Sequence, residues 1–351
     1  MRDDMTEKTS AVRERKEFLD ILRVAAVCAV VMMHTVSGVL VSADFTGFEL
    51  RETVCRVLVD VTAWCVPVFL LISGYLFLDP GRQLTWRDML GKYCRRILFA
   101  LLLFGIPYSL LELVWTERAF RPGMLWEAVR NTATGHSWAH MWYLYLILVL
   151  YAVTPLLRGI LERIPIVLSY LMAAALIFGF SLAPFWRNWK SQGVDSKVPG
   201  GGIFLFYYLC GYLFVRGERK RAPWVRGLCL VLFFAMLAGQ TAVRLFRIPL
   251  ADMAYSNPFT VIQSCLLFAG IRVRCQSTRW KRFWRELGAL SFGIYLIHPV
   301  FLNFFYKFLG ISLMNFRFLI GLPLFYGIAL FGALLASWIL RKIPVLRKYV
   351  L

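Results

Sequence analysis

The sequence has few charged residues for a chain of its length. Only 17% of its 351 residues are Asp, Glu, Lys or Arg, whereas 59% are hydrophobic with glycine left out of the count. An average soluble domain has about 45–50% apolar residues with glycine included, and about 25% charged residues. A soluble fold has no interior large enough for this much apolar surface. The composition therefore excludes a soluble protein and predicts an integral membrane protein in contact with the lipid bilayer.

Acidic residues are especially scarce, so that 40 Lys and Arg against 20 Asp and Glu give a formal net charge of +20. An excess of basic residues can serve nucleic-acid binding. In membrane proteins, however, basic residues collect on the cytoplasmic loops. We interpret the positive charge as membrane sidedness and expect no nucleic-acid partner.

Motifs for metal binding and disulfide formation are missing. The eight cysteines include no CxxC pair, and no Cys/His spacing suits zinc. Most of them lie inside apolar runs, where a thiol usually acts as a small buried hydrophobic group. We predict neither a disulfide framework nor a metal site.

Long apolar runs dominate the rest of the chain and predict an all-α, polytopic membrane bundle. A polar N-terminal segment (1–17) precedes a single membrane domain (18–351). The first run has no small-residue cleavage site and is too long for a signal peptide, so it is expected to remain as a membrane helix. The ten predicted spans cover residues 20–42, 57–78, 97–115, 141–157, 165–183, 201–215, 224–242, 258–271, 288–308 and 318–340.

The loop charges support this count. With the N-terminus in the cytoplasm, the even-numbered loops and the two ends carry more than twice as many Lys and Arg as the odd-numbered loops. A miscounted span would invert every later loop and remove this alternation. Both termini are therefore predicted to be cytoplasmic, and the short loops favour a bacterial cytoplasmic membrane. No loop is long enough for a soluble catalytic domain, so the function is expected within the bundle or at its edges.

Ionisable residues inside membrane spans are costly and usually face the bundle interior. The first span carries Asp20, Arg23 and His34. The rotation around the helix from Arg23 to His34 differs from three full turns by only about 20°, so the two side chains share a face. The rise between them along the helix axis is roughly 16 Å. Arg23 is expected near the cytoplasmic mouth, where it could hold an anion, and His34 near mid-membrane, where it could take part in proton transfer. Both functions would then lie on one face of the first helix. The alternatives are a snorkelling arginine and a structural histidine.

A second membrane histidine, His298, lies in the ninth span one turn after Tyr295 and just before Pro299. Proline frees backbone carbonyls that buried side chains or water can satisfy. The simplest interpretation is therefore a packed kink with a hydrogen-bonded histidine. The pair His34 and His298 could alternatively ligate haem, although no haem-attachment motif accompanies them.

Three further groups are candidates for binding. Ser73 and Tyr75 flank Gly74, a residue that permits close helix approach, and could line a cavity or simply pack. A basic cluster, Lys92, Arg95 and Arg96, would suit a phosphorylated cofactor or only mark the cytoplasmic side. Aromatic residues at the outer end of the fourth span, Trp142 and Tyr145 among them, form either an interfacial belt or a surface for stacking against a sugar.

Taken together, these motifs resemble acyltransferase family 3, the multi-helix membrane acyltransferases, and within it the branch that O-acetylates surface polysaccharides. The most specific match is the Arg-x10-His signature, here Arg23 and His34. Further matches in the same order are Ile72-Ser73-Gly74-Tyr75, then Trp142 with Tyr151 and Pro155, and finally Tyr295-Leu-Ile-His298-Pro299. The resemblance covers almost the whole chain.

This resemblance implies acyl-CoA, commonly acetyl-CoA, as donor on the cytoplasmic side and a glycan or lipid-linked saccharide as acceptor outside. Arg23 would contact the CoA end, with Lys92, Arg95, Arg96, Ser73 and Tyr75 as further cofactor residues, and Trp142, Tyr145, Tyr295 and His298 on the acceptor. His34 would act in acyl transfer, either as general base for the attacking hydroxyl or as the group that accepts the acyl chain first. The sequence leaves both routes open.

Two other classes of function fit the same features. A secondary transporter would use ten spans, interrupted helices and a mid-membrane histidine, but the two halves of the chain show no repeat. A membrane sensor or assembly subunit would need no chemistry at all. Release of thiol from acyl-CoA separates the enzyme from both.

Overall fold

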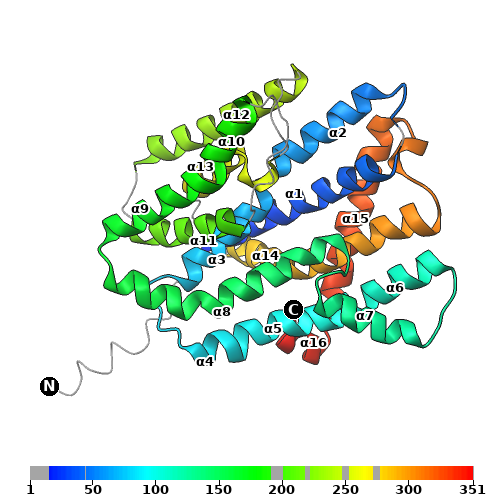
Figure 1. The fold of residues 1–351 in the computed structure, drawn as a ribbon, viewed down its shortest axis with the longest axis horizontal. Coiled ribbons are helices and arrows are strands. Elements are labelled where there is room, and N and C mark those ends of the chain that lie inside the picture. Colours follow the sequence, from blue (N-terminus) through cyan, green and yellow to red (C-terminus); the bar gives the residue numbers. More distant parts are fainter. Residues whose placement is uncertain are drawn as a thin grey trace.

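The computed structural model describes residues 16–43, 45–190, 201–217, 222–246, 253–271 and 277–350. Within these ranges the chain is a bundle of helices without strands (Figure 1). The first 15 residues of the predicted polar N-terminal segment lie outside the described residues, as does Cys275. The all-α prediction is confirmed.

Eight helical stretches are long and apolar enough to cross a membrane: Glu17–Val41, Glu49–Phe77, Trp86–Glu117, Ala139–Arg163, Ile166–Lys190, Pro223–Leu245, Thr278–Phe308 and Phe318–Leu340. Two shorter apolar helices, Gly201–Arg216 and Pro258–Gly270, correspond to the sixth and eighth predicted spans, which the sequence also predicts to be short. Each of the ten predicted runs therefore coincides with a described apolar helical stretch.

Several of these stretches are built from consecutive helices. The N-terminal half contains α1 (Glu17–Ser42), α2 (Glu49–Thr62), α3 (Cys65–Phe77), α4 (Trp86–Asp88), α5 (Arg95–Ala100), α6 (Ile106–Glu117), α7 (Gly123–Ala133) and α8 (Trp142–Arg163). The C-terminal half contains α9 (Ile166–Ile177), α10 (Ala183–Lys190), α11 (Gly201–Arg216), α12 (Pro223–Leu245), α13 (Pro258–Gly270), α14 (Thr278–Asn303), α15 (Phe318–Leu340) and α16 (Pro344–Tyr349). Short π-helical segments join α4 to α5 (Met89–Cys94) and α5 to α6 (Leu101–Gly105).

Three spans begin at least eight residues earlier than the sequence predicts. The second starts at Glu49 instead of 57, the third at Trp86 instead of 97, and the ninth at Thr278 instead of 288. The additional helical turns contain charged residues. These turns therefore do not belong to the long apolar runs from which the spans are predicted. The third span starts at a capping box in which the Thr85 hydroxyl accepts from the Asp88 N–H at 3.2 Å and the Asp88 carboxylate accepts from the Thr85 N–H at 3.0 Å.

Helix α1 runs through the interior of the bundle with α3 and α14 against it (Figure 1). The closest crossing joins α3 to α11 through two glycines. A Cβ added to Gly74 would lie 1.9 Å from the Tyr208 carbonyl oxygen, and one added to Gly211 would lie 2.4 Å from the Tyr75 nitrogen. Both obstacles are backbone atoms, so a side chain at either position would push the helices apart. Gly74 thus permits the close helix approach that the sequence predicts.

We expect Gly74→Ala to destabilise the bundle by about 1–3 kcal/mol, the usual effect of overpacking a tight contact. Thermal unfolding of the purified protein in detergent measures this loss. Gly159→Ala in α8 is the matched control, because a Cβ there meets no atom within 4 Å. An equal melting temperature for the two variants would show that the α3–α11 contact is looser than described.

The buried side chain of Arg158, on α8, fixes the end of α3. Its guanidinium donates to the carbonyl oxygens of Phe77 and Asp79, each at 2.9 Å, and of Arg82 at 2.5 Å. Carbonyls at a helix C-terminus lack intrahelical partners, and a cation there also meets the negative end of the helix dipole. Arg158 therefore positions the turn that carries Arg82 toward the functional site.

Candidate functional site

A cavity of about 480 Å³ opens between α1, α3, α8 and α14, at the end of the bundle that the loop charges assign to the cytoplasm. Each helix contributes residues that share one face. On α8 the spacing is four residues (Tyr143, Ile147, Tyr151), and on α14 it is three and four (Gly288, Ser291, Tyr295). From α1 come Arg23 and Val30, about three turns and about one turn before His34.

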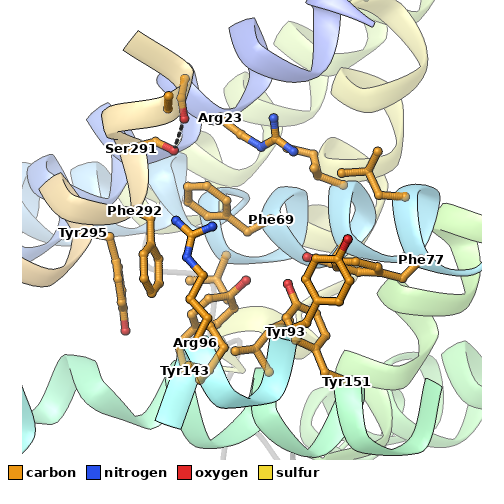
Figure 2. Close-up of a pocket in the computed structure, with 18 of the residues that line it drawn as sticks. Arg23, Phe69, Phe77, Tyr93, Arg96, Tyr143, Tyr151, Ser291, Phe292 and Tyr295 are labelled. Atoms are coloured by element: carbon orange, nitrogen blue, oxygen red, sulfur yellow. Dashed lines mark hydrogen bonds between the residues drawn. The ribbon is translucent and has the colours of Figure 1, made fainter. Parts of the chain in front are cut away.

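The cavity lining is strongly cationic. In the described part of the chain, four arginines line it, namely Arg23, Arg82, Arg96 and Arg341, and none of the described lining residues is acidic. Figure 2 shows Arg23 and Arg96 entering the space from opposite walls. Such a concentration of guanidinium groups favours an anionic ligand, and phosphate in particular, because the planar donor fork matches phosphate oxygens.

Arg23 is held in place by the carboxylate of Asp20, one turn earlier on α1, at 2.8 Å. Asp20 is almost fully buried and packs against Gly288 of α14, where an added Cβ would lie 2.9 Å from Asp20 Oδ1. The missing side chain at position 288 therefore lets α14 approach the ion pair. Asp20 is one of the three ionisable residues that the sequence analysis singles out in the first span, and it orients Arg23.

The other arginines come from three separate segments. Arg96 donates through Nε to the Val350 carbonyl oxygen at 2.8 Å and lies over the Phe292 ring. Arg82 donates to the Leu76 carbonyl oxygen at 2.8 Å. The Nε of Arg341 is buried and has no hydrogen-bond partner among the described residues. A buried donor of this kind is costly, so a bound anion would stabilise it.

Aromatic side chains form a large part of the remaining wall, together with aliphatic ones (Figure 2). Phe77 makes edge-to-face contacts with Tyr93 and Tyr151, with ring centroids 4.7 and 4.8 Å apart. These interlocked rings give the cavity a rigid shape. An apolar, aromatic wall with cations around it suits a ligand that combines phosphates with an uncharged arm.

Three histidines gather beyond the inner end of this cavity. His34 of α1 lies with its ring centroid 5.1 Å from that of His298 on α14 and 6.2 Å from that of His140. The His140 and His298 centroids are 5.8 Å apart. His140 belongs to a short 3-10 turn, Ala139–Met141, just before α8. His140 and His298 are buried, whereas His34 is only half-buried.

Tyr295 connects the cavity to this histidine cluster. Its ring lines the cavity, and its hydroxyl donates to the backbone carbonyl oxygen of His140. On the other side of the cluster, Tyr108 donates to the Leu296 carbonyl oxygen at 2.9 Å and stacks on Trp138 at 4.2 Å. These contacts hold α14, which carries His298, and the turn that carries His140 together with α6.

The buried imidazoles keep free nitrogens. His298 Nδ1 lies 3.1 Å from the Ile294 carbonyl oxygen, which fixes the ring, while Nε2 of both His140 and His298 has no partner among the described residues. The packed, hydrogen-bonded histidine before Pro299 that the sequence favours is thus present. Its second nitrogen nevertheless remains open beside His34, so the cluster can hold or pass a proton.

The structure brings several predicted site residues together. Arg23, Ser73, Arg96 and Tyr295 line the cavity, and His34 and His298 meet in the histidine cluster. Lys92 and Arg95 do not reach the cavity; both are exposed and lie over the rings of Tyr93 and Tyr349.

Tyr75 is also away from the cavity. It is buried between Phe18 and Phe268, and the Lys16 ammonium donates to its hydroxyl. On the outer side, Trp142 packs against Tyr255 and Phe204, while the Tyr145 hydroxyl donates to the Thr132 carbonyl.

Sequence reasoning missed His140, Arg82 and Arg341 as site residues. The chain contains only four histidines, and His140 begins an apolar span, which is the one signal that could have marked it. Arg82 and Arg341 look like ordinary cytoplasmic loop charges, and only the fold turns them toward the cavity.

Metal ligation finds no support in the described part of the chain, where no group of three His, Cys, Asp or Glu side chains could hold an ion. The seven described cysteines are all free thiols.

Comparison with known proteins agrees with this chemistry. A family model described as an acyltransferase domain matches residues 16–342, nearly the whole chain. No curated protein and no solved structure matches the chain significantly. The matched range includes all ten helical stretches, the cavity lined by arginines (hereafter the inner cavity) and the cluster of His34, His140 and His298. The chain therefore belongs to acyltransferase family 3 and is a membrane acyltransferase.

Proposed function

We propose that this protein transfers an acetyl group from cytoplasmic acetyl-CoA to a hydroxyl of a glycan or lipid-linked saccharide on the outer face of a bacterial cytoplasmic membrane. One observation carries the proposal. The described lining of the cavity has four arginines and no acidic residue, and it includes Tyr295, whose ring centroid lies 5.7 Å from that of His140 and 6.3 Å from that of His298, the two neighbours of His34.

The cavity suits the two halves of acyl-CoA. The nucleotide end carries phosphates, which the guanidinium groups of Arg82, Arg96 and Arg341 would bind. The pantetheine arm is uncharged and would run along the aromatic wall, past Arg23 and Ser73, toward Tyr295. Lys92, Arg95 and Tyr75 have no part in this arrangement, because they do not line the cavity.

The thioester would then stand near His34, where either of two balanced routes leads to the ester. In direct transfer, the neutral imidazole takes the acceptor's hydroxyl proton as the oxygen attacks the carbonyl carbon. The C–O bond forms, the C–S bond breaks, and the imidazolium returns the proton to the CoA thiolate. In the second route His34 accepts the acyl group, releases CoA, and passes the acyl group to the hydroxyl in a second step.

His298 and His140 act as positioning residues in this scheme. Both pack against the His34 ring, and each offers an unpartnered nitrogen that can share a proton with it. Such contacts would hold the His34 ring in one orientation as the charge on it changes.

The test compares acetyl-CoA with S-acetylpantetheine, which has the same thioester but no phosphate. The purified protein is expected to release thiol from acetyl-CoA, with an apparent affinity about 100-fold or more higher than for S-acetylpantetheine, because charge-assisted phosphate contacts are lost in the latter. Equal affinities would contradict phosphate binding in the cavity. Absence of binding and thiol release with both compounds would contradict acyl-CoA as donor.

The family match supports an enzyme over the transporter that the sequence alone leaves open. Thiol release also separates the two, since a transporter leaves the thioester intact.

A further inference from the structure

A second cavity lies toward the opposite end of α1. It has a volume of about 800 Å³ and opens between α1, α2, α12 and the start of α13. The loop charges assign this end of the bundle to the outer face. Met33 lines this outer cavity and is followed on α1 by His34 of the histidine cluster.

The two cavities differ sharply in charge. Among the described residues, the outer cavity is lined by three carboxylates (Glu49, Glu52, Asp60), two guanidinium groups (Arg56, Arg244) and two amides (Gln240, Asn257). Hydrogen-bond donors and acceptors are therefore both present, and the described acidic groups outnumber the basic ones. An anionic ligand would meet three carboxylates here, whereas the described lining of the inner cavity has four arginines and no acidic residue.

These polar groups are already held in fixed positions. Arg244 of α12 makes a two-point contact with Asp60 of α2, with Nε 2.7 Å from Oδ2 and Nη2 3.0 Å from Oδ1. Both side chains are mostly buried, with 26% and 16% of their surface exposed. Gln263 donates to Gln240 Oε1 at 2.7 Å, which leaves the Gln240 NH2 group to serve a ligand. A site fixed in this way loses little entropy on binding.

Aromatic and thioether groups separate the outer cavity from the histidines. The Tyr255 hydroxyl contacts the Met33 sulfur at 3.8 Å, and the Tyr255 ring packs against Trp142 at 5.6 Å. Tyr255 and Met33 both line the cavity. They form a short partition at the α1 wall of the cavity, where Met33 precedes His34 in the chain, so a hydroxyl bound against the partition would lie near the segment that carries His34.

We infer that the outer cavity is the acceptor site and that it selects a neutral, hydroxyl-rich saccharide unit, with the Asp60–Arg244 pair and Gln240 as its hydroxyl-binding groups. This inference rests on the proposed acetyl transfer. A sugar hydroxyl both donates and accepts, so it is satisfied by a carboxylate and a guanidinium side by side, and the aromatic partition suits the apolar face of a sugar ring. A uronic acid is disfavoured by the three carboxylates.

The experiment measures thiol release from acetyl-CoA by the purified protein with N-acetylglucosamine, glucuronate or glucosamine at matched concentrations. The neutral sugar is expected to stimulate release above the rate with water, and the anionic sugar is not. Asp60→Asn and Gln240→Leu are each expected to raise the half-saturating concentration of N-acetylglucosamine about tenfold, as loss of one good hydrogen-bonding site predicts. Neither variant should change the affinity for acetyl-CoA.

Arg121→Gln is the matched control, because Arg121 forms an exposed ion pair at the outer end of the bundle with Glu117 and Glu127, away from the outer cavity. Melting temperatures identify any variant that fails to fold, and the two substitutions lie on different helices, so one misfolded variant leaves the other informative.

Three results would overturn the inference while leaving acetyl-CoA chemistry intact: stimulation by glucuronate or glucosamine but not by the neutral sugar, no stimulation by any sugar, or unchanged half-saturation in both variants. Loss of acetyl-CoA binding and of thiol release in the wild-type protein would instead be a failure of the proposed function itself.

Discussion

Replacing His34 by alanine is expected to lower acetyl transfer by about 10²–10⁴-fold, the usual contribution of a positioned general base, with little change in acetyl-CoA affinity. His34 packs against His298 and is not among the residues that line the inner cavity. Its replacement is therefore expected to remove the group that carries out acyl transfer and to leave the phosphate-binding arginines in place. The measurement is thiol release at saturating acetyl-CoA together with a separate binding titration.

His136→Ala is the control for this variant. His136 is exposed, and its ring nitrogen Nδ1 lies 2.9 Å from the hydroxyl of the neighbouring Thr134, so removal of the ring should leave the rate unchanged. His34→Gln fills the same space without a basic nitrogen of comparable strength and should be as inactive as the alanine variant. Retained activity in His34→Gln would mean that His34 shapes the site and does not carry the proton or the acyl group.

The second large effect is expected for Arg341→Gln, which should weaken acetyl-CoA binding by about 10–100-fold. The physical reason is the buried Nε of Arg341, which lacks a hydrogen-bond partner among the described residues and belongs to a side chain that lines a cavity whose described lining contains no carboxylate. A phosphate would satisfy that donor and neutralise part of the charge that it shares with Arg82 and Arg96. The turnover rate at saturating donor should fall much less than the affinity.

Arg347→Gln removes the same charge from a nearby exposed position on α16 that does not line the cavity. It therefore controls for the net charge of the cytoplasmic end. Isothermal titration with acetyl-CoA in detergent gives both affinities. If the two variants bind equally well, the phosphates are bound elsewhere and the cavity is not the donor site.

The membrane fold is largely predictable from the sequence, because long apolar runs and loop charges report on the bilayer directly. Helix ends are less predictable where charged turns extend a span, as in the stretch from Trp86 to Arg96. The close approach at Gly74 follows from its place in an apolar helix, but its partner, Tyr208 on α11, is 134 positions away and cannot be read from local pattern.

The candidate site is predictable only where its residues share one helix. Arg23 and His34 follow from helical spacing on α1, and His298 from its place beside Pro299. His140 joins them because three separate segments meet, and Asp60 meets Arg244 across 184 positions. Local sequence carries no information on such contacts. Lys92 and Arg95 illustrate the converse: they belong to the predicted basic cluster, yet only Arg96 among its three members lines the cavity.

The most direct test of the account is an experimental structure of the protein with a non-transferable acetyl-CoA analogue in which a methylene group replaces the sulfur. The account predicts phosphate oxygens within hydrogen-bonding distance of Arg82, Arg96 or Arg341, and the acetyl carbon within about 4 Å of a His34 ring nitrogen, close enough for attack or proton transfer. An analogue bound in the outer cavity, or one whose acetyl group points away from His34, would contradict it.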